Sequence, residues 1–291
     1  MRIRYRLTVL LILSAFVSLV ACGQPTGEEA SPAVEEPTPA TGETPIEAAP
    51  PASGEEETPA PDTTDGEATP EATPDPFVGE GPWAVTFETN DGIILAGTLF
   101  GRGPVDVVLA PMYPGGQEGW LPFAEAAAEQ GYRVLSFDLR GHGESEGEAD
   151  WEAAVSDLEA ALAFLDEHGG EQFILIGAGQ GGLAAIRVAA EREDVIGLAV
   201  ISSPRAFEAL AVSDADLERL GMPSLWLGAR NDMTQSVEEL YDQAGSSDKE
   251  LWIYEGSSLH GTYIFEGADG PDLQRRLLDF LARVTGRDED A

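Results

Sequence analysis

Short apolar runs alternate along residues 83–284 with segments whose apolar residues recur at helical spacing. At the start, residues 83–89 alternate between apolar and polar positions, Asn90-Asp91-Gly92 is typical of a hairpin turn, and residues 93–100 continue as a second strand. After this hairpin the pattern predicts strands and helices in turn. Such alternation is typical of a parallel sheet that is covered by helices on both faces.

The elements predicted after the hairpin all follow this alternation. Strands are expected at residues 105–110, 134–137, 173–176, 197–201, 224–228 and 251–254, and helices at residues 120–130, 151–165, 182–190, 237–244 and 273–284. Ligands of such sheets bind outside the carboxyl ends of the strands. We therefore expect the chemistry of this protein in the loops that follow its strands.

The N-terminal segment has the pattern of a targeting signal rather than of a folded domain. Three arginines precede an apolar run at residues 7–20, which has the length of a signal peptide and is shorter than the about 20 residues of a membrane-spanning helix. The following Leu-Val-Ala-Cys at residues 19–22 resembles the lipobox of bacterial lipoproteins, whose cysteine is acylated and becomes the new N-terminus. Cys22 is the only cysteine of the chain, so it has no disulfide partner within it. We expect a lipid anchor at Cys22, and an ordinary signal peptide or a short anchor is the alternative.

The segment after Cys22 cannot form a core. Residues 23–75 contain no Trp, Tyr, Phe or Leu, so they bury too little apolar surface to offset the entropy of the chain. The sequence therefore predicts three parts: a lipoprotein signal peptide over residues 1–21, a lipidated cysteine and acidic tether over residues 22–76, and one folded domain over residues 77–291. In this arrangement the domain is extracytoplasmic and is anchored to the cell membrane through its lipid.

The charge of the chain excludes one class of partner. The formal net charge is −37, from 53 acidic and 16 basic side chains, and Lys249 is the only lysine. Nucleic acid is bound by clusters of Lys and Arg, and no basic block follows the first six residues. No His or Cys pair has the spacing of metal ligands, so neither a metal nor a cofactor is expected. The expected partner is a small molecule.

Two stretches of sequence carry a family resemblance. Gly-Tyr-Arg-Val at residues 131–134 and Asp-Leu-Arg-Gly-His-Gly-Glu-Ser at residues 138–145 closely resemble the segment GY-x-V…D-x-RGHG-x-S of the α/β-hydrolase superfamily. The resemblance implies the α/β-hydrolase fold, a mostly parallel twisted sheet with helices on both faces. It also implies that His142 and Ser145 belong to the scaffold. Residues 204–223 leave room for only a minimal cap.

The loop after the strand at residues 173–176 resembles the nucleophile elbow of this family. It reads Gly-Ala-Gly-Gln-Gly-Gly over residues 177–182, and a strand, a Gly-x-?-x-Gly turn and a helix are the context that presents a serine oxygen above the sheet. Gly179 occupies the serine position. The same loop matches the dinucleotide pattern G-x-G-x-x-G, but that fingerprint belongs to the first βα turn of a sheet, whereas this loop follows a hairpin and two βα units.

The other two triad positions are filled. Ala-Arg-Asn-Asp at residues 229–232 resembles the acid loop of the family, and residues 255–262 resemble its histidine loop. The resemblance implies that Asp232 orients the imidazole of His260, which would take the proton of the serine in an active member.

The loop that follows the strand at residues 105–110 departs from the family. Pro111 stands where many members carry histidine, and proline donates no N–H. An oxyanion hole is still expected from the N–H of Gln180 with that of Met112 or Tyr113.

The sequence thus predicts a hydrolase-like protein that lacks its nucleophile. The expected function is that of a membrane-tethered pseudoenzyme, which has lost ordinary serine-hydrolase chemistry and binds a small ligand, such as an ester or amide, in the old pocket. Two alternatives stay open. One is an active ester or amide hydrolase in which His260 activates a water lodged at the position of the serine oxygen. The other is a non-enzymatic interaction module of the cell envelope.

Overall fold

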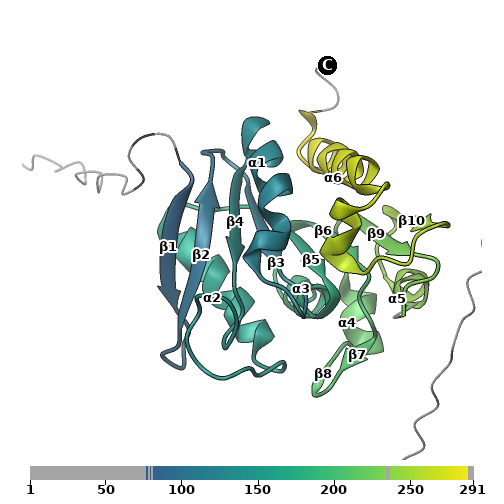
Figure 1. The fold of residues 1–291 in the computed structure, drawn as a ribbon, viewed down its shortest axis with the longest axis horizontal. Helices are drawn as coiled ribbons and strands as arrows, with labels where there is room; N and C mark the ends of the chain where they lie inside the picture. Colours follow the sequence, from purple (N-terminus) through teal and green to yellow (C-terminus); the bar gives the residue numbers. More distant parts are fainter. Residues whose placement is uncertain (1–76, 78, 80, 234–235, 288–291) are drawn as a thin grey trace, which may run out of the picture. The chain divides into compact units, whose positions relative to one another are not determined.

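The computed structural model describes residues 77, 79, 81–233 and 236–287 (Figure 1). The predicted signal peptide, Cys22 and the whole of the predicted tether lie outside the described residues. Within the described part of the chain, no helix has both the length and the apolar character of a membrane span.

An eight-stranded sheet with the order β1-β2-β4-β3-β5-β6-β9-β10 forms the centre of the domain (Figure 1). Its strands are β1 (Trp83–Glu88), β2 (Ile94–Phe100), β3 (Asp106–Ala110), β4 (Arg133–Phe137), β5 (Phe173–Ala178), β6 (Val195–Ile201), β9 (Ser224–Ala229) and β10 (Lys249–Tyr254). The strand β2 is antiparallel to β1 and β4, and every other neighbouring pair is parallel. The predicted mostly parallel sheet is confirmed.

Helices cover both faces of the sheet. They are α1 (Leu121–Glu129), α2 (Ala154–Glu167), α3 (Gly179–Ala189), α4 (Asp214–Arg219), α5 (Val237–Gln243) and α6 (Gly270–Val284), with the 3₁₀ helices η1 (Gln117–Trp120) and η2 (Gly261–Glu266). Two apolar clusters fill the space between the sheet and its helices. Phe123 of α1 and Leu277 of α6 belong to the cluster on one face of the sheet, whereas Leu158 of α2 and Leu183 of α3 belong to the cluster on the other face. In Figure 1, α1 and α6 accordingly lie on one side of the sheet and α2 and α3 on the other.

The minimal cap predicted between β6 and β9 is present as a small insertion. It contains a hairpin of β7 (Ala206–Phe207) and β8 (Leu210–Ala211), followed by α4. Ser213 caps α4 through a capping box with Asp216. The sequence did not predict the hairpin, because strands of two residues carry no periodic signal.

Three helices begin three residues away from their predicted starts, and one of them is α6, which begins at Gly270 rather than at residue 273. The helix expected at residues 151–165 begins at Ala154, because Asp150 Oδ1 accepts the N–H groups of Glu152 and Ala153 and holds Trp151 in a turn. The helix expected from Gly182 begins at Gly179. Three glycines in its first turn disfavour a helix in isolation, and tertiary packing overrides that preference here.

Candidate active site

The turn between β5 and α3 has the backbone of a nucleophile elbow. Gly179 adopts φ +51, in the left-handed region that glycine enters without a steric penalty. The neighbouring glycines allow close packing: a Cβ added at Gly177 would collide with the carbonyl of Gly181, and one at Gly181 with the carbonyls of Ala110 and Pro111. The turn therefore requires small residues around the position that a serine would occupy.

Asp232 and His260 form a hydrogen-bonded pair at the same edge of the sheet. Asp232 follows β9 and is buried, and His260 follows β10. The imidazole Nδ1 lies 3.1 and 3.0 Å from the two carboxylate oxygens of Asp232. A carboxylate at Nδ1 selects the tautomer with its proton there, which leaves Nε2 as the nitrogen that faces the site.

The imidazole points at the empty side-chain position of the elbow. A Cβ added at Gly179 would lie 3.2 Å from Nε2 of His260 and 3.0 Å from Cβ of Met112. The structure thus brings together the three residues that the sequence nominated as a triad, from loops after β5, β9 and β10. It contains the carboxylate and the imidazole of a serine-hydrolase triad. At the nucleophile position it contains the backbone turn but no side-chain oxygen.

One expected oxyanion donor already has an acceptor inside the protein. The N–H of Tyr113 donates to Oε1 of Gln180 over 2.9 Å, and Gln180 is buried. The sequence left two candidates for the second oxyanion donor beside the N–H of Gln180. The N–H of Tyr113 already donates to a side chain, so the N–H of Met112 is the remaining candidate. No sequence motif signals this contact, because it depends on the rotamer of one side chain.

The loop after β4 is braced as the family resemblance implies. Arg140 donates from Nε to Asp157 and from Nη1 to Asp91, both over 2.7 Å. Ser145 donates to the carbonyl of Asp138 over 2.6 Å and accepts the N–H of Ala96 over 2.9 Å. These contacts hold a loop rather than present reacting groups.

The pKa values of the two carboxyl groups that contact Arg140 are shifted in opposite directions. The hydrogen bonds from Arg140 hold the pKa of Asp91 well below its usual range. Burial raises the pKa of Asp157, although its hydrogen bonds to Arg140 oppose the shift.

An aromatic cluster lies beside the site. The ring of Trp151 packs against Tyr113, His142 and Phe207, with centroid distances of 5.0, 4.9 and 5.3 Å. Since Phe207 belongs to β7, the cluster connects the small cap to the loop that carries Met112 and Tyr113. The sequence alone does not indicate Trp151 and Phe207 as residues of the site, because only the fold brings their loops together.

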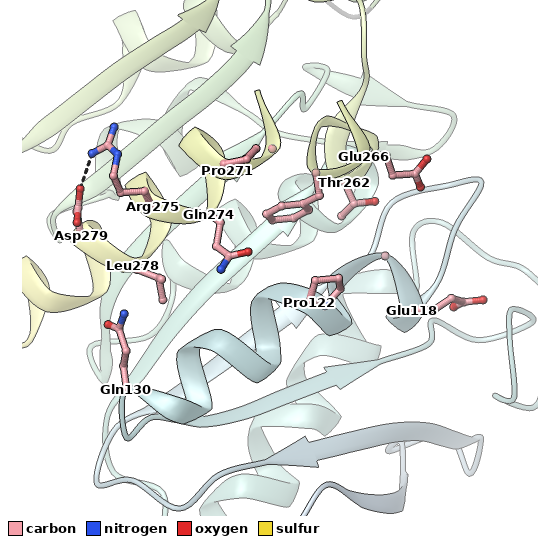
Figure 2. Close-up of a pocket in the computed structure, with 13 residues that line it drawn as sticks. Glu118, Pro122, Gln130, Thr262, Glu266, Pro271, Gln274, Arg275, Leu278 and Asp279 are labelled. Atoms are coloured by element: carbon pink, nitrogen blue, oxygen red, sulfur yellow. Dashed lines mark hydrogen bonds and ion pairs between the residues drawn. The ribbon is translucent and has the colours of Figure 1, made fainter. Parts of the chain in front are cut away.

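A separate groove of about 520 Å³ lies between α1, η2 and α6 (Figure 2). Its wall includes Thr262, two residues after His260, and the ion pair of Arg275 with Asp279 at 2.7 Å. Within the described residues, no group of three or more His, Cys, Asp and Glu side chains has an arrangement that could hold a metal ion. The groove lining has no paired nucleophile and base, so we place the candidate chemistry at Gly179 and His260.

The sheet order and the Asp–His pair at its carboxyl edge define the class of the protein as an α/β-hydrolase fold. A model of the alpha/beta hydrolase family matches residues 101–287. The chain belongs to this family.

Solved structures and a curated relative extend the comparison. The chain is similar to the esterase Pf2001 of Pyrococcus furiosus (20% identity, TM-score 0.61, covering 70% of this chain and 93% of that one) and to a malate-bound thermophilic esterase of Thermogutta terrifontis (18% identity, TM-score 0.59, 69% and 99%). These identities show a shared fold alone. The uncharacterized protein YfhR of Salmonella typhi is 31% identical over 117 residues, which span 35% of this chain and only 40% of that relative.

Proposed function

We propose that this protein is a hydrolase-like ligand-binding protein that does not form an acyl-enzyme. The observation that carries the proposal is the position of Gly179, whose missing Cβ would lie 3.2 Å from Nε2 of His260. Covalent catalysis requires an oxygen or sulfur at that point, and glycine supplies neither. The retained turn and the Asp232–His260 pair beside it support binding of a small ester, amide or related molecule at this point.

A second function is favoured by the retained Asp232–His260 pair. An imidazole whose Nδ1 is held 3.0 Å from a buried carboxylate is arranged to accept a proton at Nε2. A water at the position of the serine oxygen would then attack an ester directly. This candidate is an active hydrolase without a covalent intermediate.

The location of the protein is part of the proposal and depends on residues 19–22. The mature chain begins at an acylated Cys22, and the acidic segment after it holds the domain outside the membrane. Mass spectrometry of the purified protein should find a lipid on residue 22 as the N-terminus, and a Cys22→Ser variant should be released or remain unprocessed. An unmodified residue 22, or cleavage elsewhere, contradicts the anchor.

A non-enzymatic interaction module of the cell envelope is the remaining candidate function if the domain binds no small ligand.

The test of the proposal combines a covalent probe with turnover. The wild-type protein should not react with fluorophosphonate probes, which label activated serines, and stoichiometric labelling of any serine overturns the proposal. Turnover of a panel of short acyl esters separates the two functions. Hydrolysis that disappears in His260→Ala establishes the water mechanism, and its absence favours the ligand-binding protein.

A further inference from the structure

The groove between α1, η2 and α6 has polar side chains on all three of its walls (Figure 2). Gln130 caps the end of α1, Thr262 belongs to η2, and Gln274 belongs to α6. Figure 2 shows the amide of Gln274 directed from α6 toward α1. The volume of about 520 Å³ lies within the roughly 300–1,000 Å³ of pockets that take small molecules. The groove is therefore large enough to hold a small ligand.

The hydroxyl of Thr262 lies at the wall of the groove without a partner from the protein. Thr262 is only 6% exposed, and its Oγ1 makes no hydrogen bond within the described part of the chain. Gly119 also lines the groove, and a Cβ added there would lie 2.7 Å from this oxygen. The absence of a side chain at Gly119 thus leaves one side of the hydroxyl uncovered. Since buried hydroxyls normally have a hydrogen-bond partner, a ligand in the groove would supply the missing one.

The two amides at the groove are available to a ligand as well. The side chains of Gln130 and Gln274 form no hydrogen bond with any residue that the structure describes. Each amide offers two N–H donors and a carbonyl acceptor. Hydroxyl groups also donate and accept, so a ligand with several hydroxyls matches these amides. An ammonium group only donates, and it would leave the N–H groups without acceptors.

The remaining wall combines apolar surface with a cation that is already paired. Pro122, Phe265 and Leu278 contribute the apolar surface. Arg275 is the one cationic side chain among the described residues of the lining, and it forms an ion pair with Asp279 at 2.7 Å. An anionic ligand therefore finds no unpaired cation in this groove. The lining fits a neutral ligand that has both hydroxyl groups and an apolar face.

We propose that this groove is a binding site for a neutral saccharide. The hydroxyls at the edge of a pyranose ring would pair with Thr262, Gln130 and Gln274, and the C–H faces of the ring would pack on the apolar wall. A purely apolar ligand would cover the same polar groups without replacing their hydrogen bonds to water, which costs free energy. The site is separate from Gly179 and His260 and independent of the function proposed there.

The test measures saccharide binding to the full-length protein by ligand-observed NMR. The probes are the neutral methyl glycosides of glucose, galactose, mannose and N-acetylglucosamine, and at least one of them should bind saturably. Two relatives of the tightest glycoside then change only the charge at C6: a uronic acid and a 6-amino-6-deoxy sugar. The uronic acid should bind at least about threefold more weakly, because the exposed charges of the wall are mostly carboxylates. The amino sugar should bind no more tightly than the neutral glycoside.

Substitutions locate the binding in the groove. Thr262→Val removes the hydroxyl but keeps the shape of the side chain, so the affinity for the glycoside should fall roughly five- to tenfold, as expected for one hydrogen bond. The urea midpoint should not fall, because this hydroxyl has no partner in the described chain. Gln274→Leu should weaken binding by a similar factor. The matched control, Gln172→Leu, removes an exposed amide outside the groove lining and should leave the affinity unchanged.

Four results overturn the inference. The first is that no neutral glycoside binds, and the second is that the affinity is unchanged in Thr262→Val. The third is tighter binding of the amino sugar, which would assign recognition to the carboxylates Glu118 and Glu266 of the wall. The fourth is loss of binding in His260→Ala, which would place the saccharide at the candidate active site. Fluorophosphonate labelling of a serine contradicts the proposed function alone and leaves these binding results intact.

Discussion

The two halves of the candidate site differ in what they retain. The turn of Gly177–Gly182 keeps the backbone of a nucleophile elbow but lacks its reacting atom. On the opposite side, Asp232 and His260 keep both geometry and chemical groups, 3.0 Å apart. The elbow is fixed by packing, since β3, β5 and α3 meet there, whereas the Asp–His pair is formed by hydrogen bonds between two loops, which are also linked by the N–H of Asn231 donating to the carbonyl of Ser257. Packing of the fold therefore explains why the glycine-rich turn is retained. It does not explain why Asp232 and His260 are retained as a hydrogen-bonded pair.

The largest expected effect tests the packing of the elbow. In Gly181→Ala, the new Cβ would collide with the carbonyl oxygens of Ala110 and Pro111. Backbone cannot move aside as a flexible side chain does, so the free energy of unfolding should fall by about 3 kcal/mol, at the upper end of overpacking effects. Urea unfolding measures this change.

The matched control for this substitution is Gly256→Ala. A Cβ at Gly256 meets no atom within 4 Å, so its unfolding free energy should stay within about 0.5 kcal/mol of wild type. If both variants unfold at the same urea concentration, close packing does not explain the glycines of the elbow.

The next effect tests whether the two halves still belong to one site. Gly179→Ser places a side chain at φ +51, which should lower the free energy of unfolding by about 1–3 kcal/mol. It also places a hydroxyl beside Nε2 of His260. Weak hydrolysis of short acyl esters and labelling by fluorophosphonates should appear together.

Both activities should disappear in Gly179→Ser/His260→Ala, because the serine then has no base. A folded Gly179→Ser protein without activity or labelling would show that the pocket is eroded although the backbone persists. In that case the contact of Gln180 with the N–H of Tyr113 is the first feature to examine, since it engages a donor that an oxyanion would use.

The sequence predicted the sheet better than the parts that connect it. Strands such as β5 and β6 are continuous apolar runs, and the alternation with helices was sufficient to predict a parallel sheet. The hairpin of β7 and β8 was not predictable, because it is defined by pairing rather than by periodicity. The start of α3 at Gly179 contradicts local propensity and follows from tertiary contacts.

The same division holds for the candidate site. Asp232 and His260 were predicted because their loops resemble the acid and histidine loops of the family and because each follows a strand, and parallel strands bring their carboxyl ends to one edge. The contact of Gln180 with Tyr113 and the packing of Trp151 on Phe207 were not predicted. Both depend on side-chain conformation between loops that are distant in sequence.

The smallest expected effect concerns the brace of the loop after β4, the part of the site whose role is structural. Because hydrogen bonds from Arg140 lower the pKa of Asp91, this carboxylate contributes stability above its unfolded pKa of about 4 and loses that contribution as the pH falls through its lower folded value. Asp91→Asn should therefore melt slightly below wild type at pH 7, and the difference should shrink toward zero between about pH 4 and pH 2. Thermal unfolding followed by circular dichroism measures both midpoints across this range. Glu171→Gln, which removes an exposed carboxylate that the brace does not contact, should show no such pH-dependent difference. A difference between Asp91→Asn and wild type that persists unchanged at pH 2 would assign the effect to the shape of the hairpin turn rather than to the charge of the brace.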